Sequence, residues 1–314
     1  MADYNTILSA TLPVFLVIVA GFAFHRRGWL SEEMEVGVMK LGLNLLFPCF
    51  ILSIVPGNPA LAKFATAGWA IGIGFTLVVT GMGLAWLGGR LARLRKGEGL
   101  RTFVISVGIQ NYGFLALPIV VSLFPDNPGP AGLIFVHGVG VEIAMWTIGL
   151  AILSGKAGYR SIINGPFIAV VAALILNYTG LYQWIPGIFQ TAMEMLGRCA
   201  VPMSVFMIGA TIGSYFRHGI FTDAVRVAAS SVVVRLGVMA VLILLTAKYL
   251  PLTPDLKRLL VVQAAMPAAV FPIMLSRLYG GQPQVAIQVV LATSIVSIVS
   301  VPFVIAWGLG WVNP

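Results

Sequence analysis

The chain contains ten apolar runs, each long enough to cross a lipid bilayer as a helix, which takes about 20 residues. We predict spans at residues 5–25, 34–56, 64–89, 102–124, 131–154, 165–184, 187–213, 225–250, 259–279 and 285–311. Only 9% of the residues are charged, against about 25% in soluble domains. We therefore expect an all-α polytopic membrane protein of about ten transmembrane helices, with no inserted soluble domain.

The Lys and Arg residues of the predicted loops are distributed unevenly between the two sides of the membrane. Twelve lie on one side and four on the other, while Lys40 is close enough to an end of its span to reach the membrane surface. Loops rich in basic residues stay in the cytoplasm, so both termini are expected outside it, in a bacterial inner membrane. The same rule accounts for the net charge of +9, and we expect no nucleic-acid partner.

Four prolines near the centres of spans indicate an internal repeat. Pro48 and Pro118 lie in the second and fourth spans, and Pro202 and Pro272 each follow one of them by 154 residues. Because five spans are an odd number, the second copy would be inserted upside down. The sequence thus predicts two inverted five-helix repeats, residues 1–154 and 155–314, which is typical of secondary transporters.

The fourth and ninth spans are predicted to be broken and to cross near mid-membrane. Both contain helix-breaking prolines, and Pro267 and Pro272 are alternative positions for the second crossing. Broken helices would leave unpaired backbone groups around one spot, and half-helix N-termini suit a carboxylate. The candidate substrate-binding residues are Asn111, Tyr112, Gly113, Pro118, Gln263, Met266, Pro267 and Pro272.

Ionisable residues inside spans are costly and are candidates for coupling or gating. Glu142 lies near the middle of the fifth span, His137 about a turn and a half before it, and Arg235 near the middle of the eighth. We predict that Glu142 pairs with Arg235 across the bundle. A permanent pair would be structural, whereas a carboxyl group facing a cavity would carry a proton. His137 is either a packing residue or a proton carrier. Glu194 and Arg198, at i and i+4, should pair along their own helix.

Five segments carry a resemblance to a known family: LGLNLLFPCFIL, GIQNYGFLALPI, AVPMSVFMIGA, AMPAAVFPIML and LATSIVSIVSVPF. In this order they resemble the auxin efflux carrier family, in its bacterial branch, over essentially the whole chain. The resemblance implies a scaffold of spans 1, 2, 6 and 7, often a dimer interface, and a transport domain of spans 3–5 and 8–10 that moves in an elevator-type cycle. Pro48, Glu194, Arg198 and Pro202 would belong to the scaffold. Family substrates are small organic anions such as indole acetate, malonate or malate.

Other functions remain open. A sodium-coupled symporter of the bile acid transporter type shares the implied fold, and Glu142, Asn111 and Gln263 could supply oxygen ligands, although the ninth span has no acidic residue. A channel is disfavoured by the inverted repeat. A membrane-embedded enzyme is disfavoured because the spans contain no paired aspartates and no HExxH helix. We expect no catalytic site, no metal site and no cofactor beyond a coupled proton or sodium ion.

Overall fold

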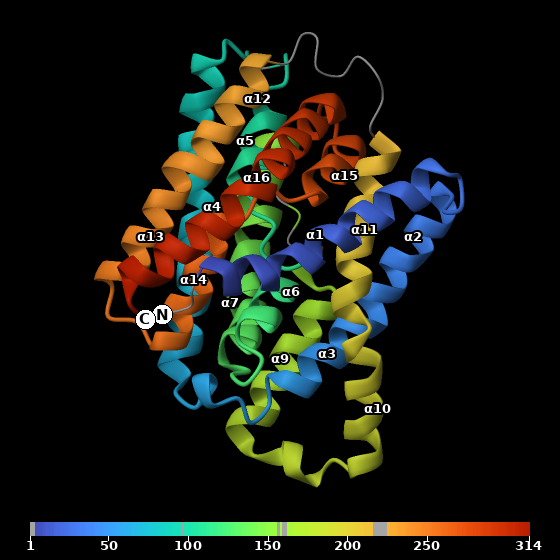
Figure 1. Ribbon diagram of the computed structural model, residues 1–314, viewed down its shortest axis with the longest axis vertical. Helices are drawn as coiled ribbons and strands as arrows, with labels where there is room; N and C mark the ends of the chain where they lie inside the picture. Colours follow the sequence, from blue (N-terminus) through green and yellow to red (C-terminus); the bar gives the residue numbers. More distant parts are fainter. Residues whose placement is uncertain (1–3, 96, 156–157, 159–161, 216–224) are drawn as a thin grey trace.

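The computed structural model describes residues 4–95, 97–155, 158, 162–215 and 225–314, and the regular structure in this part of the chain is helical (Figure 1). The α-helices are α1 (Tyr4–Arg26), α2 (Glu32–Leu41), α3 (Phe47–Ile54), α4 (Phe64–Leu91), α5 (Leu100–Gly108), α6 (Ala116–Leu123), α7 (Gly129–Ala144), α8 (Leu150–Ser154), α9 (Gly165–Thr179), α10 (Gly187–Arg198), α11 (Ala200–Tyr215), α12 (Val225–Val232), α13 (Met239–Tyr249), α14 (Pro254–Ala265), α15 (Phe271–Leu278) and α16 (Pro283–Val312). Three π-helical segments, η1 (Gly42–Leu46), η3 (Met145–Gly149) and η6 (Val233–Val238), continue neighbouring helices, and η2 (Pro59–Leu61) and η5 (Leu181–Trp184) are 3-10 turns.

The helices confirm a polytopic membrane protein. Among the described residues, 7 helices are long and apolar enough to cross a membrane: Ile7–Arg26, Glu33–Ile54, Phe64–Leu91, Gly129–Ser154, Gly187–Ser214, Val225–Tyr249 and Pro283–Val312. The predicted sixth span corresponds to the shorter apolar helix α9. The predicted fourth and ninth spans are each split into two short helices, α5 with α6 and α14 with α15. The superposition of two inverted repeats stays a prediction.

The four prolines that indicated the repeat occupy one kind of position. Pro48 and Pro272 lie at the start of α3 and α15, and Pro118 and Pro202 are the third residues of α6 and α11. The first turn of a helix tolerates proline because its N–H groups have no intrahelical acceptor. Pro118, Pro202 and Pro272 therefore lie in the first turn of the second helix of their spans, and Pro48 lies at the start of α3, which η1 joins to α2.

The most extensive helix contacts form two groups, which also touch each other through α1 and α16. Helix α1 packs against α11, and α3 packs against α9 and α10, so predicted spans 1, 2, 6 and 7 lie together. Helix α4 packs against α5 and α7, and α14 packs against α13 and α16 (Figure 1). The contact between α1 and α11 requires glycine, because a Cβ atom on Gly209 would lie 1.9 Å from the carbonyl oxygen of Ile18. Small residues allow this close approach of backbones in membrane helices.

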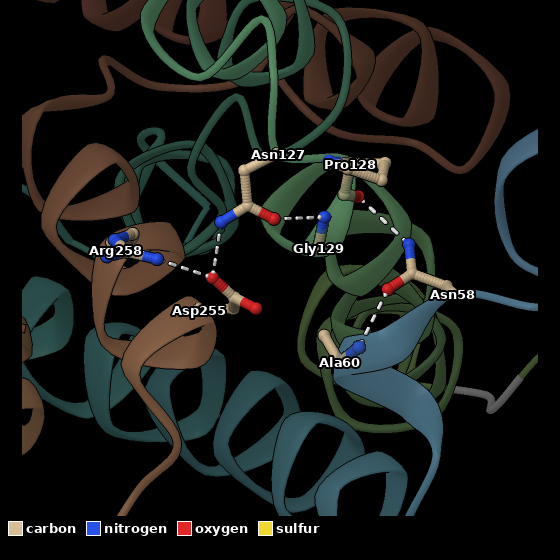
Figure 2. Close-up of polar contacts among 7 residues, drawn as sticks. All are labelled: Asn58, Ala60, Asn127, Pro128, Gly129, Asp255 and Arg258. Atoms are coloured by element: carbon tan, nitrogen blue, oxygen red, sulfur yellow. Dashed lines mark hydrogen bonds and ion pairs between the residues drawn. The ribbon is translucent and has the colours of Figure 1, made fainter.

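A polar network joins the segments before α4 and α7 to the first turns of α14 (Figure 2). The side-chain nitrogen of Asn58, before α4, donates to the carbonyl oxygen of Pro128, at the start of α7, at 2.9 Å. The side chain of Asn127 donates at 2.8 Å to Asp255 in the first turn of α14, and Arg258 donates to the same carboxylate oxygen at 2.7 Å. These bonds hold segments from the first half of the chain against the start of α14.

Candidate functional site

The interruptions of the predicted fourth and ninth spans are hydrogen-bonded to each other. The backbone N–H of Asn111 donates to the carbonyl oxygen of Pro267 at 2.8 Å, and that of Ala269 donates to Ile109 at 2.9 Å. Between these bonds, Gln110 and Ala268 form an antiparallel bridge. We call the two segments, residues 109–115 and 266–270, the paired breaks. Both peptide segments leave the helix at the same place and use each other as hydrogen-bond partners.

Of the prolines in the fourth and ninth spans, one lies in the contact between the paired breaks and two lie beside it. Pro267 lies in the contact and accepts from Asn111, whereas Pro118 and Pro272 lie beyond it, in the first turns of α6 and α15. Of the two alternatives in the ninth span, Pro267 therefore lies at the contact. A missing N–H is harmless there because the proline contributes its carbonyl oxygen.

Several backbone groups of the paired breaks have side-chain partners, although we expected unpaired groups at these interruptions. The side-chain oxygen of Asn111 accepts from the N–H of Leu115 at 3.1 Å, and the hydroxyl of Thr293 accepts from the N–H of Ala268 at 3.2 Å. The side-chain nitrogen of Gln263 donates to the carbonyl oxygen of Tyr112 at 3.0 Å. Side chains thus replace the missing helical partners, as buried backbone groups require.

A cavity of about 310 Å³ lies beside the paired breaks. Asn111, Tyr112 and Gly113 line it, together with residues of α2, η1, α7, the start of α9 and α15. The other candidate binding residues are buried, and none of them lines this cavity in the described part of the chain. They are Pro118, Gln263, Met266, Pro267 and Pro272.

A second cavity, of about 230 Å³, lies on the other side of Phe47, Phe114 and Phe271, which line both. Its polar wall residues include Glu35, whose carboxylate is 2.5 Å from the Nδ1 atom of His25. Sequence reasoning did not single out this pair.

Glu142 lies in the wall of the first cavity and is held by two neutral donors. The Tyr112 hydroxyl donates to one carboxylate oxygen at 3.1 Å, and the Asn164 side-chain nitrogen donates to the other at 2.7 Å. Tyr112 reaches this position because Gly138 leaves room, since a Cβ atom there would lie 2.7 Å from the tyrosine ring. Asn164 also accepts from the N–H of Phe167 at 2.9 Å and caps α9. The sequence analysis missed Asn164, although Asn before Gly-Pro is a helix-start signal.

The predicted ion pair between Glu142 and Arg235 is wrong. Arg235 lies in η6 and has no exposed surface, and no described residue accepts a hydrogen bond from its guanidinium nitrogens. His137, on α7, is likewise 0% exposed and has no partner among the described residues for either ring nitrogen. Of the three coupling candidates, only Glu142 lines one of the two cavities.

The predicted pair of Glu194 and Arg198 is confirmed. The two side chains are 2.5 Å apart on α10 and are 53% and 75% exposed. Lys40, which is expected to reach the membrane surface, is exposed in the last turn of α2 and also lines the first cavity.

Comparison with known proteins agrees with this architecture. The family model described as a membrane transport protein matches residues 6–164 and 153–305. An uncharacterized transporter of Methanothermobacter thermautotrophicus is 24% identical over 237 residues, covering 72% of this chain and 74% of the relative. An uncharacterized transporter of Methanocaldococcus jannaschii is 22% identical over 282 residues, covering 87% of this chain and 89% of the relative. With both halves matched and the helices of a multi-pass membrane protein, the chain belongs to the membrane transport protein family, the auxin efflux carrier family that its motifs resemble, and is a transporter rather than an enzyme.

Proposed function

We propose that this protein is a secondary transporter that carries small organic carboxylates by alternating access. The observation that carries the proposal is the cavity beside the paired breaks. Its walls come from both groups of helices, with α2, η1 and α9 on one side and α7, α15 and the breaks on the other. Transporter sites typically lie at discontinuous helices between two such groups. An elevator-type movement of one group against the other would turn the cavity from one side of the membrane to the other.

The chemistry of the wall supports a carboxylate as substrate. Lys40 offers a cation, and Asn44 and Asn111 offer amide groups, within a wall that is mostly apolar. This combination suits small organic acids such as malonate, malate or indole acetate. Lys40 and Asn164 flank loops that are predicted to be cytoplasmic, so we place the opening of this cavity on the cytoplasmic side of a bacterial inner membrane, with both termini on the opposite side.

Coupling is proposed to involve Glu142. It lines the cavity, and its hydrogen-bond partners Tyr112 and Asn164 are both neutral. A carboxyl group in this position is able to exchange a proton with the cavity as substrate binds. In the described part of the chain, neither cavity is lined by His137 or Arg235. Both side chains are buried, which favours a structural role.

We propose a homodimer through the scaffold. The Glu194–Arg198 pair is exposed on α10, inside a helix that is apolar enough to cross a membrane. Lipid solvates such charges poorly. A second copy packed against α10 would remove the pair from lipid, together with the exposed side chains of Ile188 and Met195.

Exchange assays in proteoliposomes test the proposed function. The purified protein is reconstituted, loaded with unlabelled malonate, malate or indole acetate, and supplied with the same labelled compound outside, with and without sodium and with and without a pH gradient. We expect saturable uptake that is accelerated by internal substrate. Uptake that never saturates and shows no exchange would indicate a channel, and an absolute requirement for sodium would support the bile acid transporter type instead.

A further inference from the structure

One positive and one negative side chain line the cavity beside the paired breaks. Lys40 lies in the last turn of α2, and Glu142 lies in α7. The ion pairs among the described residues include neither of them. Lys40 is exposed, whereas Glu142 is partly buried, and a charge away from bulk water is costly unless an opposite charge meets it. Glu142 therefore favours a cationic group of a ligand, and Lys40 is accessible to an anionic one.

The start of α9 brings the two charged residues to the same cavity. Asn164 donates to Glu142 at 2.7 Å. The next residue, Gly165, packs so closely on η1 that a Cβ atom there would lie 2.6 Å from the carbonyl oxygen of Leu43. Leu43 follows Lys40 by less than one helical turn. Residues 164–165 therefore contact both the segment that follows Lys40 and the side chain of Glu142.

The carboxylate of Glu142 retains acceptor capacity. An ionised carboxylate has about four acceptor sites, and the hydrogen bonds from Tyr112 and Asn164 occupy one on each oxygen. A primary ammonium group has three donors and a positive charge, whereas Tyr112 and Asn164 carry no charge. The surrounding wall includes the aromatic residues Trp146 and Phe271, and aromatic faces attract cations.

We infer that the substrate is a zwitterion, namely an amino acid with an apolar side chain. Its carboxylate meets Lys40, its ammonium group meets Glu142, and its side chain packs against the aromatic wall. This inference rests on the proposed transport of organic carboxylates and narrows the substrate class. A simple organic anion would meet Lys40 and leave Glu142 to be neutralised by the coupled proton, whereas a zwitterion supplies the positive charge itself.

Matched compounds separate the contributions of the two charged groups. Binding to the purified protein is measured by calorimetry for L-phenylalanine, for 3-phenylpropanoate, which lacks the ammonium group, and for phenethylamine, which lacks the carboxylate. L-Leucine and 4-methylpentanoate form a second, smaller pair. We expect each amino acid to bind about tenfold or more tightly than its matched acid, a difference of about 1.4 kcal/mol.

Two substitutions assign the preference to residues. Glu142→Gln should abolish the preference for the amino acid while binding of 3-phenylpropanoate persists, which also shows that the variant is folded. Lys40→Gln should weaken binding of both compounds. Glu98→Gln and Lys63→Gln, at exposed positions outside both cavities, are the charge-matched controls and should bind like the wild type.

The remaining outcomes overturn the inference in distinguishable ways. If the matched acids bind as tightly as the amino acids, the zwitterion is wrong and transport of organic anions stands. If phenethylamine binds most tightly, the cavity is a cation site, which contradicts both the zwitterionic substrate and the proposed transport of carboxylates. If neither the acids nor the amino acids bind, the zwitterionic substrate and the proposed transport of carboxylates are both wrong.

Discussion

Replacement of Asn111 by alanine should impair transport far more than it impairs folding. The side-chain oxygen of Asn111 accepts from the N–H of Leu115 at 3.1 Å, and loss of such a cap costs about 0.5–2 kcal/mol. The bond from its backbone N–H to Pro267, at 2.8 Å, does not depend on the side chain. The side-chain nitrogen donates to no described residue at the cavity wall, so it is the group that is able to donate to a substrate.

A lost hydrogen bond to a charged substrate is worth about 1.5–3 kcal/mol, which weakens binding roughly 10- to 150-fold. Asn111→Asp keeps the acceptor for Leu115 but replaces the donor by a negative charge, so it should fold better than Asn111→Ala and transport anions no better. Ser31→Ala removes the cap of α2, a bond of 3.3 Å outside the cavities, and should leave transport unchanged. Initial uptake rates per folded protein decide the matter. Rates within about twofold of wild type for both Asn111 variants would refute the reasoning.

Three further predictions concern stability and coupling between residues. Asn58→Ala removes three hydrogen bonds of a side chain that is 3% exposed, so thermal unfolding should show a loss of about 1–3 kcal/mol with an unchanged KM. Gly209→Ala forces α1 and α11 apart and should abolish the monodisperse peak in size-exclusion chromatography, whereas Gly68→Ala, which meets nothing within 4 Å, should not. Glu142→Gln and Arg235→Met should have additive effects on stability, within about 0.5 kcal/mol, because the two side chains do not pair. An interaction energy well above about 0.5 kcal/mol in this double-mutant cycle would contradict the prediction.

Features that depend on a single segment could be predicted well. The spans follow from the length of each apolar run, and the pairing of Glu194 with Arg198 follows from their spacing on one helix. The interruptions near Pro118 and Pro267 follow from the loss of a backbone donor. Each of these effects acts within a few residues along the chain, so neither the fold nor a neighbour is needed to anticipate it.

Features that join different segments could not be predicted in this way. The sequence pointed to Glu142 as important and then assigned it the wrong partner, because both Arg235 and Asn164 were compatible with a mid-span carboxyl group. Asn164 lies in a connection just before α9, where only the packing of Gly165 on η1 brings it to α7.

The sequence by itself determined that this protein lies in a membrane, which segments cross the membrane and which of them are interrupted. Lipid as solvent requires long apolar segments with internally satisfied backbone groups, and the order of residues along the chain is enough to recognise such segments. Only the tertiary structure decided which faces of the helices meet. In lipid both the inward and the outward faces of a helix are apolar, so hydrophobic periodicity does not specify helix rotation. The cavity, the partners of Glu142 and the isolation of Arg235 all depend on that rotation.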